Sequence, residues 1–380
     1  MIKKVKLSEI CDLQNGYAFK SNDYVKKSNT LNCRMSNIRP GAIFDIEYNP
    51  KYLPDEYSEI YKDYLLNDGD IIIAMTDLAG DPKILGVPAQ VQTNGKNILL
   101  NQRVGKLTIK DKNKIFYKYL KYALSNPRNK EYYKRFAGGG LQINISKKDI
   151  LNIEIPLPIM KEQIDIADRL DKIQEIIDIR KKQIEEFDGL IKARFVELFG
   201  DPVSNPRGWE TKRFDALCEN LDSRRKPITA SEREAGIYPY YGASGVVDYV
   251  ADYLFDEDIL LVSEDGANLL MRSTPIAFSV NGKVWVNNHA HVVRFEKMSM
   301  QKYIEVFFSM IDISEHITGS AQPKLNQAKL NAMMFPVPDD DRLEAFLSFV
   351  EQTDKSKLEL QKSLEEMQNL FDSLMAEYFG

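Results

Sequence analysis

The segments Phe195-Val-Glu-Leu-Phe-Gly200 and Met375-Ala-Glu-Tyr-Phe-Gly380 resemble each other and lie 180 residues apart. The same offset aligns Ile155-Pro-Leu-Pro158 with Phe335-Pro-Val-Pro338. An internal repeat of this kind constrains the fold before any single element is assigned. The sequence therefore predicts two similar halves, each made of a folded segment, a Pro-x-Pro motif and a long helix.

The repeat continues upstream with a changing offset, as expected where loops differ in length. Asp70-Ile-Ile-Ile73 matches Asp258-Ile-Leu-Leu261 at an offset of 188, and Val5–Cys11 loosely matches Lys212–Cys218 at 207. The two halves thus share a frame and differ in the segments inserted into it.

The segments that follow the Pro-x-Pro motifs have the periodicity of a coiled-coil seam. Counted in alternating steps of four and three, the seam positions of the first segment are Ile166, Leu170, Ile173, Ile177, Arg180, Ile184, Phe187, Ile191, Arg194 and Leu198. Those of the second segment are Phe346, Val350, Thr353, Lys357, Leu360, Leu364, Met367, Phe371, Leu374 and Tyr378. Eight of ten positions are apolar in each. The alternative is an amphipathic helix packed on its own domain, but forty helical residues extend about 60 Å, beyond a small domain's core.

The segments that precede the helices have a mixed helix and strand pattern. Asp70–Ala74 and Asp258–Val262 are short apolar runs after turn residues, which predicts buried strands. Residues 115–124 and 128–136 predict two helices separated at Pro127.

We predict an α+β fold, with two mixed α/β domains separated by two long helices packed as an antiparallel coiled coil. The antiparallel direction follows from a two-fold-like arrangement of the repeats. The domains are residues 1–158 and 201–338, and the helices are residues 159–200 and 339–380.

Composition and charge limit the classes of function. With 43% hydrophobic residues the chain can bury sizeable cores. The formal net charge of the chain is −5. Residues 161–200 carry a net charge of −2 and residues 339–380 carry −7, so the remaining residues have a net charge of +4. A mildly basic remainder permits DNA binding. The three cysteines, Cys11, Cys33 and Cys218, suit reduced thiols. The sequence shows no signal peptide and no apolar run that could span a bilayer, so we expect a cytoplasmic protein that does not associate with a membrane.

Motifs for catalysis on nucleic acid are missing from the sequence. There is no Gly-x-x-x-x-Gly-Lys-[Ser/Thr] loop, no Gly-x-Gly-x-x-Gly turn and no Asn/Asp-Pro-Pro-Tyr/Phe tetrapeptide of amino-methyltransferases. His289 and His291 are predicted on one face of a strand, but two histidines do not complete a metal site. We expect no catalytic centre, metal or cofactor in this chain.

Side chains that could contact DNA occur beside turn residues in both halves, because Arg, Lys, Asn and Gln are the usual donors to base edges and phosphates. In the first half the candidates are Gln14, Asn15, Tyr17, Lys20, Arg34, Asn37, Arg39, Asn101, Arg103 and Gln142. In the second half they are Arg224, Arg225, Lys226, Tyr241, Ser244, Asn287, Asn288, Gln322 and Lys324. The loop Gly138-Gly-Gly-Leu-Gln142 is a flexible binding loop or a hinge. Ordinary polar loops remain the alternative for any single residue.

The order of these parts resembles the specificity (S) subunit of type I restriction-modification systems. Ile155-Pro-Leu-Pro158 leads to Glu162-Gln163-Ile164 and then to the heptad helix ending at Phe195–Gly200. Tyr240–Gly245, followed by Asp258–Leu261 and Glu264-Asp265-Gly266, is similar to the recognition domains of that family. As a departure, the second half has Asp341-Arg342 in place of Glu-Gln.

The resemblance implies two target-recognition domains, each recognising one half of a split double-stranded DNA site. The helices would dock two methyltransferase subunits, and motor-nuclease subunits would join for cleavage. S-adenosylmethionine would belong to those partners. The helices also carry apolar residues outside the seam, which need cover from a partner or from the recognition domains: Ile176, Ile179, Leu190, Leu358 and Leu370.

Three other functions remain open at this point: an autonomous DNA-modifying enzyme, a scaffold that only spaces partners, and a DNA-recognition subunit of a different modification or defence complex. The missing catalytic motifs argue against the first. The different inserts on a shared frame argue against the second.

Overall fold

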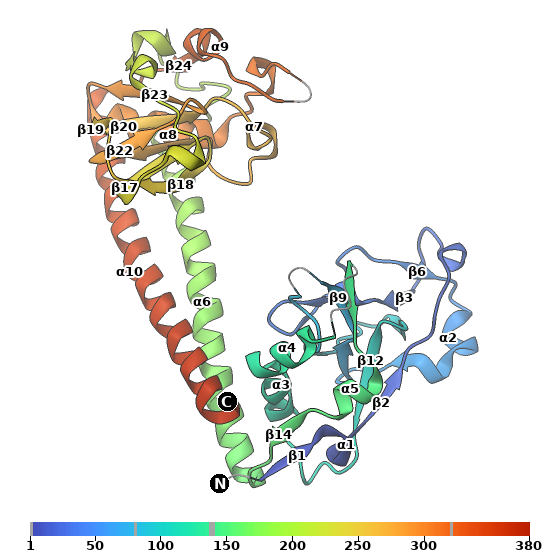
Figure 1. The fold of residues 1–380 in the computed structure, drawn as a ribbon. Helices are drawn as coiled ribbons and strands as arrows, with labels where there is room; N and C mark the ends of the chain where they lie inside the picture. Colours follow the sequence, from blue (N-terminus) through green and yellow to red (C-terminus); the bar gives the residue numbers. More distant parts are fainter. Residues whose placement is uncertain (1–2, 80–81, 137–140, 320–321) are drawn as a thin grey trace. The chain divides into compact units, whose positions relative to one another are not determined.

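The computed structural model describes residues 3–79, 82–136, 141–319 and 322–380, and its contacts divide the chain into two compact units (Figure 1). The first unit consists of Met1–Ile179 and Leu364–Gly380, and the second of Arg180–Ser363. The two long helices, α6 (Met160–Phe199) and α10 (Asp340–Phe379), each contribute one part to each unit. The predicted α+β class is confirmed.

The first unit contains two four-stranded sheets and a set of short helices. Its strands are β1 (Lys4–Lys6), β2 (Cys11–Asn15), β3 (Thr30–Cys33), β4 (Ile38–Arg39), β5 (Ile43–Phe44), β6 (Tyr52–Leu53), β7 (Leu65–Leu66), β8 (Ile71–Ala74), β9 (Thr76–Leu78), β10 (Pro88–Gln90), β11 (Asn97–Leu100), β12 (Val104–Ile109), β13 (Gln142–Asn144) and β14 (Glu154–Pro156). Its short helices are α1 (Leu7–Ile10), α2 (Tyr57–Ile60), α3 (Tyr117–Ser125), α4 (Pro127–Lys134) and α5 (Lys147–Leu151).

The second unit repeats this plan with fewer strands. Its strands are β15 (Thr211–Arg213), β16 (Cys218–Asn220), β17 (Ala235–Gly242), β18 (Gly245–Val250), β19 (Phe255–Asp256), β20 (Ile259–Ser263), β21 (Ala277–Val280), β22 (Lys283–Val286), β23 (Ala290–Phe295) and β24 (Met334–Pro336). Its short helices are α7 (Asn268–Met271), α8 (Met298–Met310) and α9 (Gln327–Ala332).

The two units have the same sheet topology. The antiparallel sheet β10-β8-β12-β2 corresponds to β21-β20-β23-β16, and the mixed sheet β6-β3-β11-β7 corresponds to β18-β17-β22-β19. One strand pair is parallel in each mixed sheet, β3 with β11 and β17 with β22. The ribbons β1–β14 and β15–β24 also correspond. The repeat seen in the sequence is therefore a repeat of the fold.

The apolar runs predicted as strands are central strands buried on both faces. In β8, Ile71 and Ile73 face the helices, whereas Ile72 and Ala74 face the second sheet. Both faces of such a strand are covered, which is why the run is continuous and not alternating.

The offset of 188 between these runs is wrong by one residue. It pairs Ile71 with Ile259, but Ile259 packs between the sheets, and the residue that faces the helices is Leu260. The structural offset is therefore 189. A shift of one residue exchanges the two faces of a strand, and a run that is apolar on both faces does not reveal the shift.

The junction before each long helix differs between the halves. Gln163 is fully buried; its Oε1 accepts the Phe116 N–H at 2.8 Å, and its Nε2 donates to the carbonyls of Lys114 and Pro158 at 2.9 and 2.8 Å. The residue 180 positions later is Leu343, which is buried in the core of the second unit. The predicted alignment of Glu162-Gln163 with Asp341-Arg342 is therefore also wrong by one residue, because the offset of 180 pairs Glu162-Gln163 with Arg342-Leu343.

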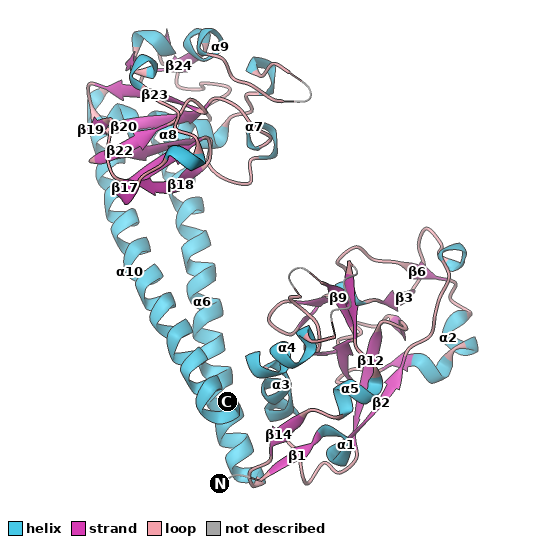
Figure 2. Cartoon of the chain, in the orientation of Figure 1, coloured by secondary structure: helices cyan, strands magenta, loops and turns pink. Residues whose placement is uncertain are grey.

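The long helices α6 and α10 lie side by side (Figure 2). None of the twenty predicted seam residues is exposed. Within the second unit Phe199 contacts Phe346, with ring centroids 5.3 Å apart, and Asp188 forms an ion pair of 2.6 Å with Lys357. Low residue numbers on α6 thus face high numbers on α10, which makes the helices antiparallel as predicted.

Each unit is closed by the last turns of a long helix. Met375 and Phe379 of α10 lie in the core of the first unit, where the Phe379 ring is 5.2 Å from that of Tyr119. Phe195 and Phe199 of α6 occupy the equivalent place in the second unit. Asn126 Nδ2 also donates a hydrogen bond to the Phe379 carbonyl.

All three cysteines are free thiols, as expected, and burial raises the pKa of Cys11, Cys33 and Cys218 to about 12. Proline begins α4 at residue 127, and the side chain of Asn126 caps that helix, in agreement with the predicted break. Within the described ranges, no helix has an apolar stretch sufficient to cross a bilayer.

Replacing Phe379 with Ala should destabilise the first unit by about 3–5 kcal/mol, because a buried ring is removed and a cavity remains. Hydrogen exchange should show loss of amide protection in β8 and β12, with β20 and β23 retained. Phe199→Ala should give the reverse pattern, and the exposed Glu377→Ala should change neither. Equal loss of protection in both units for each variant would contradict this account.

Candidate nucleic-acid interface

A tight turn follows the same strand in both units. It links β11 to β12 in the first unit and β22 to β23 in the second. In the first turn, Asn101 Oδ1 accepts the N–H of Arg103 at 3.2 Å. In the second, Asn287 Oδ1 accepts the N–H of His289 at 2.8 Å. Both asparagines are buried, while Arg103 and His289 are exposed, so the turn directs its third side chain outward.

In the first unit this turn borders a hollow of about 530 Å³. The hollow is lined by Asn15, Met75, Thr76, Gln102, Arg103, Asn144, Ile145, Ser146, Lys147 and Lys148. Three of these residues are cations and none is an acid. Among the described residues, no carboxylate lies within ion-pair distance of Arg103, Lys147 or Lys148. The hollow therefore offers donors and unneutralised positive charge to an anionic ligand.

In the second unit the equivalent surface places an acidic side chain beside each basic or imidazole group. His289 Nδ1 lies 2.9 and 3.0 Å from the two carboxylate oxygens of Asp265. Lys324 Nζ lies 3.0 Å from Glu264. The two units thus present different electrostatics on the same frame.

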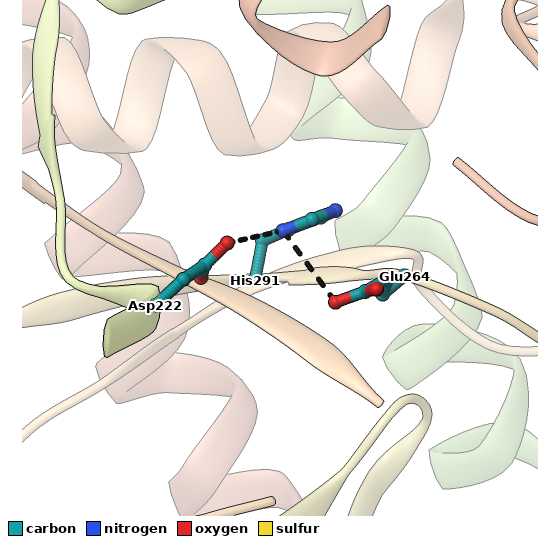
Figure 3. A group of neighbouring side chains, drawn as sticks. All are labelled: Asp222, Glu264 and His291. Carbon is teal, nitrogen blue, oxygen red and sulfur yellow. Dashed lines mark hydrogen bonds and ion pairs between the residues drawn. The ribbon is translucent and has the colours of Figure 1, made fainter. Parts of the chain in front are cut away.

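Beneath this surface lies a charged network around His291 (Figure 3). His291 is buried, and its Nδ1 is 2.6 Å from Asp222 and 3.7 Å from Glu264. Arg225 contacts both carboxylates, at 2.7 Å from Glu264 and 3.3 Å from Asp222. Asp222 Oδ1 also accepts the Val292 N–H at 2.8 Å. The network joins the segment before β17 to β20 and β23.

The carboxyl groups of this network are held in their charged form. Burial by itself would raise the pKa of Asp222, but the hydrogen bond and charge of His291 outweigh it and lower that pKa below its ordinary value. Burial likewise opposes ionisation of Glu264, and its hydrogen bonds with Arg225 and Lys324 lower its pKa overall.

Asp222, Glu264 and His291 lie close enough to share a cation, but the donor set does not fit one. Arg225 and Lys324 already place two positive charges on the carboxylates. The second ring nitrogen of His291 is 2.8 Å from the Leu325 carbonyl, so it acts as a donor. The prediction that His289 and His291 share a strand face is wrong: His289 lies in the turn before β23 and is exposed, whereas His291 is buried.

Residues 2–187 and 206–367 match the family model described as the type I restriction modification DNA specificity domain. The chain belongs to this family.

Two relatives carry the same description. S.HindORF215P of Haemophilus influenzae, provisionally described as a type I restriction enzyme specificity subunit, is 33% identical over 34% of this chain and 33% of that protein. The MjaVIII specificity subunit of Methanocaldococcus jannaschii is 31% identical over 48% of this chain and 42% of that protein. The chain thus matches less than half the length of either relative.

The type I S subunit from M. genitalium, known from a crystal structure, has the same fold. It superposes with a TM-score of 0.60 over 100% of this chain and 96% of that one, at 16% identity. At this identity the likeness establishes the fold.

The specificity-domain fold leaves most of the predicted DNA-contacting residues at the surface. Those that are exposed are Gln14, Asn15, Tyr17, Lys20, Arg103, Arg224, Lys226, Ser244, Asn288, Gln322 and Lys324. Those that are half-buried are Arg34, Arg39, Gln142, Arg225 and Tyr241. Asn15 and Arg103 meet in the hollow. Residues 138–140 of the glycine loop lie outside the described residues.

Several predicted contacts have partners within the protein. Asn37 is buried and donates to the carbonyls of Asp45 and Tyr48. Arg225 belongs to the buried network, and Arg224 forms an ion pair of 2.6 Å with Glu257. These side chains hold the loops in place.

Sequence reasoning missed Asn144, Lys147 and Lys148 of the hollow, which follow Gln142 along the chain. Ser146 could have indicated these residues from the sequence, because a serine is a common helix N-cap. It caps α5 and so places Lys147 in the first turn of that helix.

It also missed the aromatic cluster around Tyr17. The rings of Phe19, Tyr61 and Tyr64 lie 5.0, 4.5 and 5.5 Å from that of Tyr17. The hydrogen bond with Tyr17, together with burial, raises the pKa of Tyr61 to about 12. Such a cluster offers an aromatic face on which a base or sugar can stack.

The charged network should make the second unit sensitive to acid. Because the pKa values of Asp222 and Glu264 are lowered by folding, their stabilisation is present above the unfolded values near 4 and is lost as pH falls through the folded values. Thermal unfolding between pH 7 and 3 should show this loss. Asp222→Asn with Glu264→Gln should flatten the dependence, and an unchanged slope would contradict the assignment.

Proposed function

We propose that this chain is the DNA sequence-specificity subunit of a type I restriction-modification complex. In this role it recognises the two halves of a split double-stranded DNA site and docks two methyltransferase subunits and motor-nuclease subunits. Residues 1–158 and 201–338 act as recognition domains, and residues 159–200 and 339–380 act as the spacer helices. The chain itself contributes no catalytic centre.

The observation that carries this proposal is the repeated fold with different surfaces. Both units have the same strand order, yet the first presents a basic hollow without acids, and the second places Asp265 beside His289 and Glu264 beside Lys324 at the equivalent place. A scaffold that only spaces partners has no need for such a difference. A pair of domains that recognise different base sequences requires it.

The proposed non-catalytic role agrees with the sequence. The motifs that hold nucleotide phosphates or a flipped adenine are missing from the chain. In this proposal the cofactor S-adenosylmethionine is bound by the methyltransferase subunits.

Docking of partners is supported by apolar residues on the long helices. Ile176, Ile179 and Leu190 of α6 are exposed, as are Leu358 and Leu370 of α10. The recognition units leave these side chains uncovered. Apolar groups at the surface of long helices gain free energy when a partner removes them from water.

The arrangement of these residues favours two copies of one partner. At 100° per residue, Ile176, Ile179 and Leu190 lie within about 60° of one another around α6. Leu190 and Leu370 are 180 positions apart and are 50% and 42% exposed. The repeat thus places the same apolar side chain at equivalent points of both helices, one for each methyltransferase.

Recognition by the two units should be separable. In a complex reconstituted with its methyltransferase, sequencing of methylated DNA should give a bipartite motif. Replacing residues 207–338 with those of a relative should change one half of the motif and leave the other unchanged, because each unit has its own core. A change in both halves, or methylation without sequence preference, would refute the proposal.

Leu190→Asp should remove one methyltransferase subunit, and Leu370→Asp the other, since a buried charge without a partner is strongly unfavourable. Native mass spectrometry should show a two-to-one complex becoming one-to-one for each single variant. The matched control is Lys181→Asp or Gln361→Asp, exposed positions on the opposite flank of the seam. A two-to-one complex that survives both leucine substitutions would place the docking surface elsewhere.

A further inference from the structure

The turns at Asn101–Arg103 and Asn287–His289 have the same hydrogen-bonded frame. Besides the asparagine bonds described above, the Asn101 N–H donates to the Cys33 carbonyl at 3.1 Å, and the Asn287 N–H donates to the Tyr241 carbonyl at 3.0 Å. These bonds tie the start of each turn to the neighbouring parallel strand.

The end of each turn is fixed in the same way. The Arg103 carbonyl accepts the Met75 N–H at 3.0 Å, and the His289 carbonyl accepts the Glu264 N–H at 2.9 Å. The backbone of the third turn residue is therefore held on both sides, through its N–H and its carbonyl. The position of its Cβ is set by the frame and not by the side chain.

The side chain at this fixed position differs between the units. Arg103 projects into the basic hollow without an acidic partner among the described residues. His289 is about half exposed and uses Nδ1 toward Asp265, which leaves only Nε2 for an external group.

We propose that Arg103 and His289 are equivalent specificity-determining residues, each contacting a base edge in the half-site of its own unit. This inference rests on the proposed function. A rigid turn that carries a variable side chain is suited to this task, because the frame places different hydrogen-bonding groups at the same point of a DNA groove.

The chemistry of the two side chains predicts different contacts. The guanidinium of Arg103 carries only donors in a planar fork, which matches the O6 and N7 acceptors of guanine in the major groove. His289 can make one hydrogen bond through Nε2. The half-site of the first unit should therefore contain a guanine at the position that Arg103 contacts, with stronger discrimination than at the position of His289.

Lys147 and Lys148 have a different role in this arrangement. They border the same hollow, and a lysine ammonium suits a phosphate oxygen as a point charge. They would hold the DNA backbone, which sets the register of the duplex without recognising sequence. Asn101 and Asn287 are positioning residues, since their side-chain oxygens are engaged by the turn.

The test is the methylation motif of the reconstituted complex carrying Arg103→Ala or His289→Ala. Arg103→Ala should make a single base pair of one half-site degenerate, with discrimination reduced by about tenfold or more, and leave the other half-site intact. His289→Ala should affect one base pair of the other half-site. Arg128→Ala and His316→Ala, which remove similar groups elsewhere in the first and second units, should leave the motif unchanged.

Arg103→Lys separates base recognition from phosphate binding. It keeps the charge but loses the fork, so a base contact predicts a relaxed motif with affinity largely retained. An unchanged motif with uniformly weaker binding in the Ala variant, or an unchanged motif in the Lys variant, would overturn the inference. If the complex with Arg103→Ala methylates no DNA, the methylation motif of the Arg103→Lys complex is the deciding measurement. A wild-type complex without a bipartite motif would instead refute the proposed function.

Discussion

Met375 and Phe379 pack in the core of the first unit, and Phe195 and Phe199 pack in the core of the second. Each unit is thus completed by the final turns of the helix that belongs, in sequence order, to the other repeat. Neither half of the chain contains all the apolar residues of one core. Because each long helix begins in one unit and ends in the core of the other, both helices must be continuous and antiparallel. The same arrangement explains why the heptad register is the same in both helical segments.

Much of this fold could be predicted from the sequence, because the seam and the apolar runs are long and periodic. The strand offset was missed by one residue, since Ile71, Ile72 and Ile73 are alike and both faces of β8 are buried. The predicted alignment at Gln163 was also wrong by one residue. Its counterpart is Leu343, and because an amide and an aliphatic side chain do not resemble each other, the sequence does not reveal that the two positions correspond.

The candidate interface was harder to predict than the fold. Composition cannot distinguish an asparagine that faces a ligand from one bonded to its own backbone, as Asn101 and Asn287 are. Arg224 and Arg225 are adjacent and identical in type, yet Arg225 joins a buried network and Arg224 lies at the surface. The hollow combines segments distant in sequence, and only the fold brings Arg103 together with Lys147 and Lys148.

The closure of the first unit by α10 has a consequence for synthesis of the protein. Strands β1 to β14 leave the ribosome before any part of the second unit, but Met375 and Phe379 come from the far end of the chain. The unit that is translated first therefore exposes an incomplete apolar core until residues 364–380 emerge. During that interval its bare surface is open to chaperones and proteases. A chain that ends after residue 363 contains every residue of the second unit but lacks the part of α10 that completes the first.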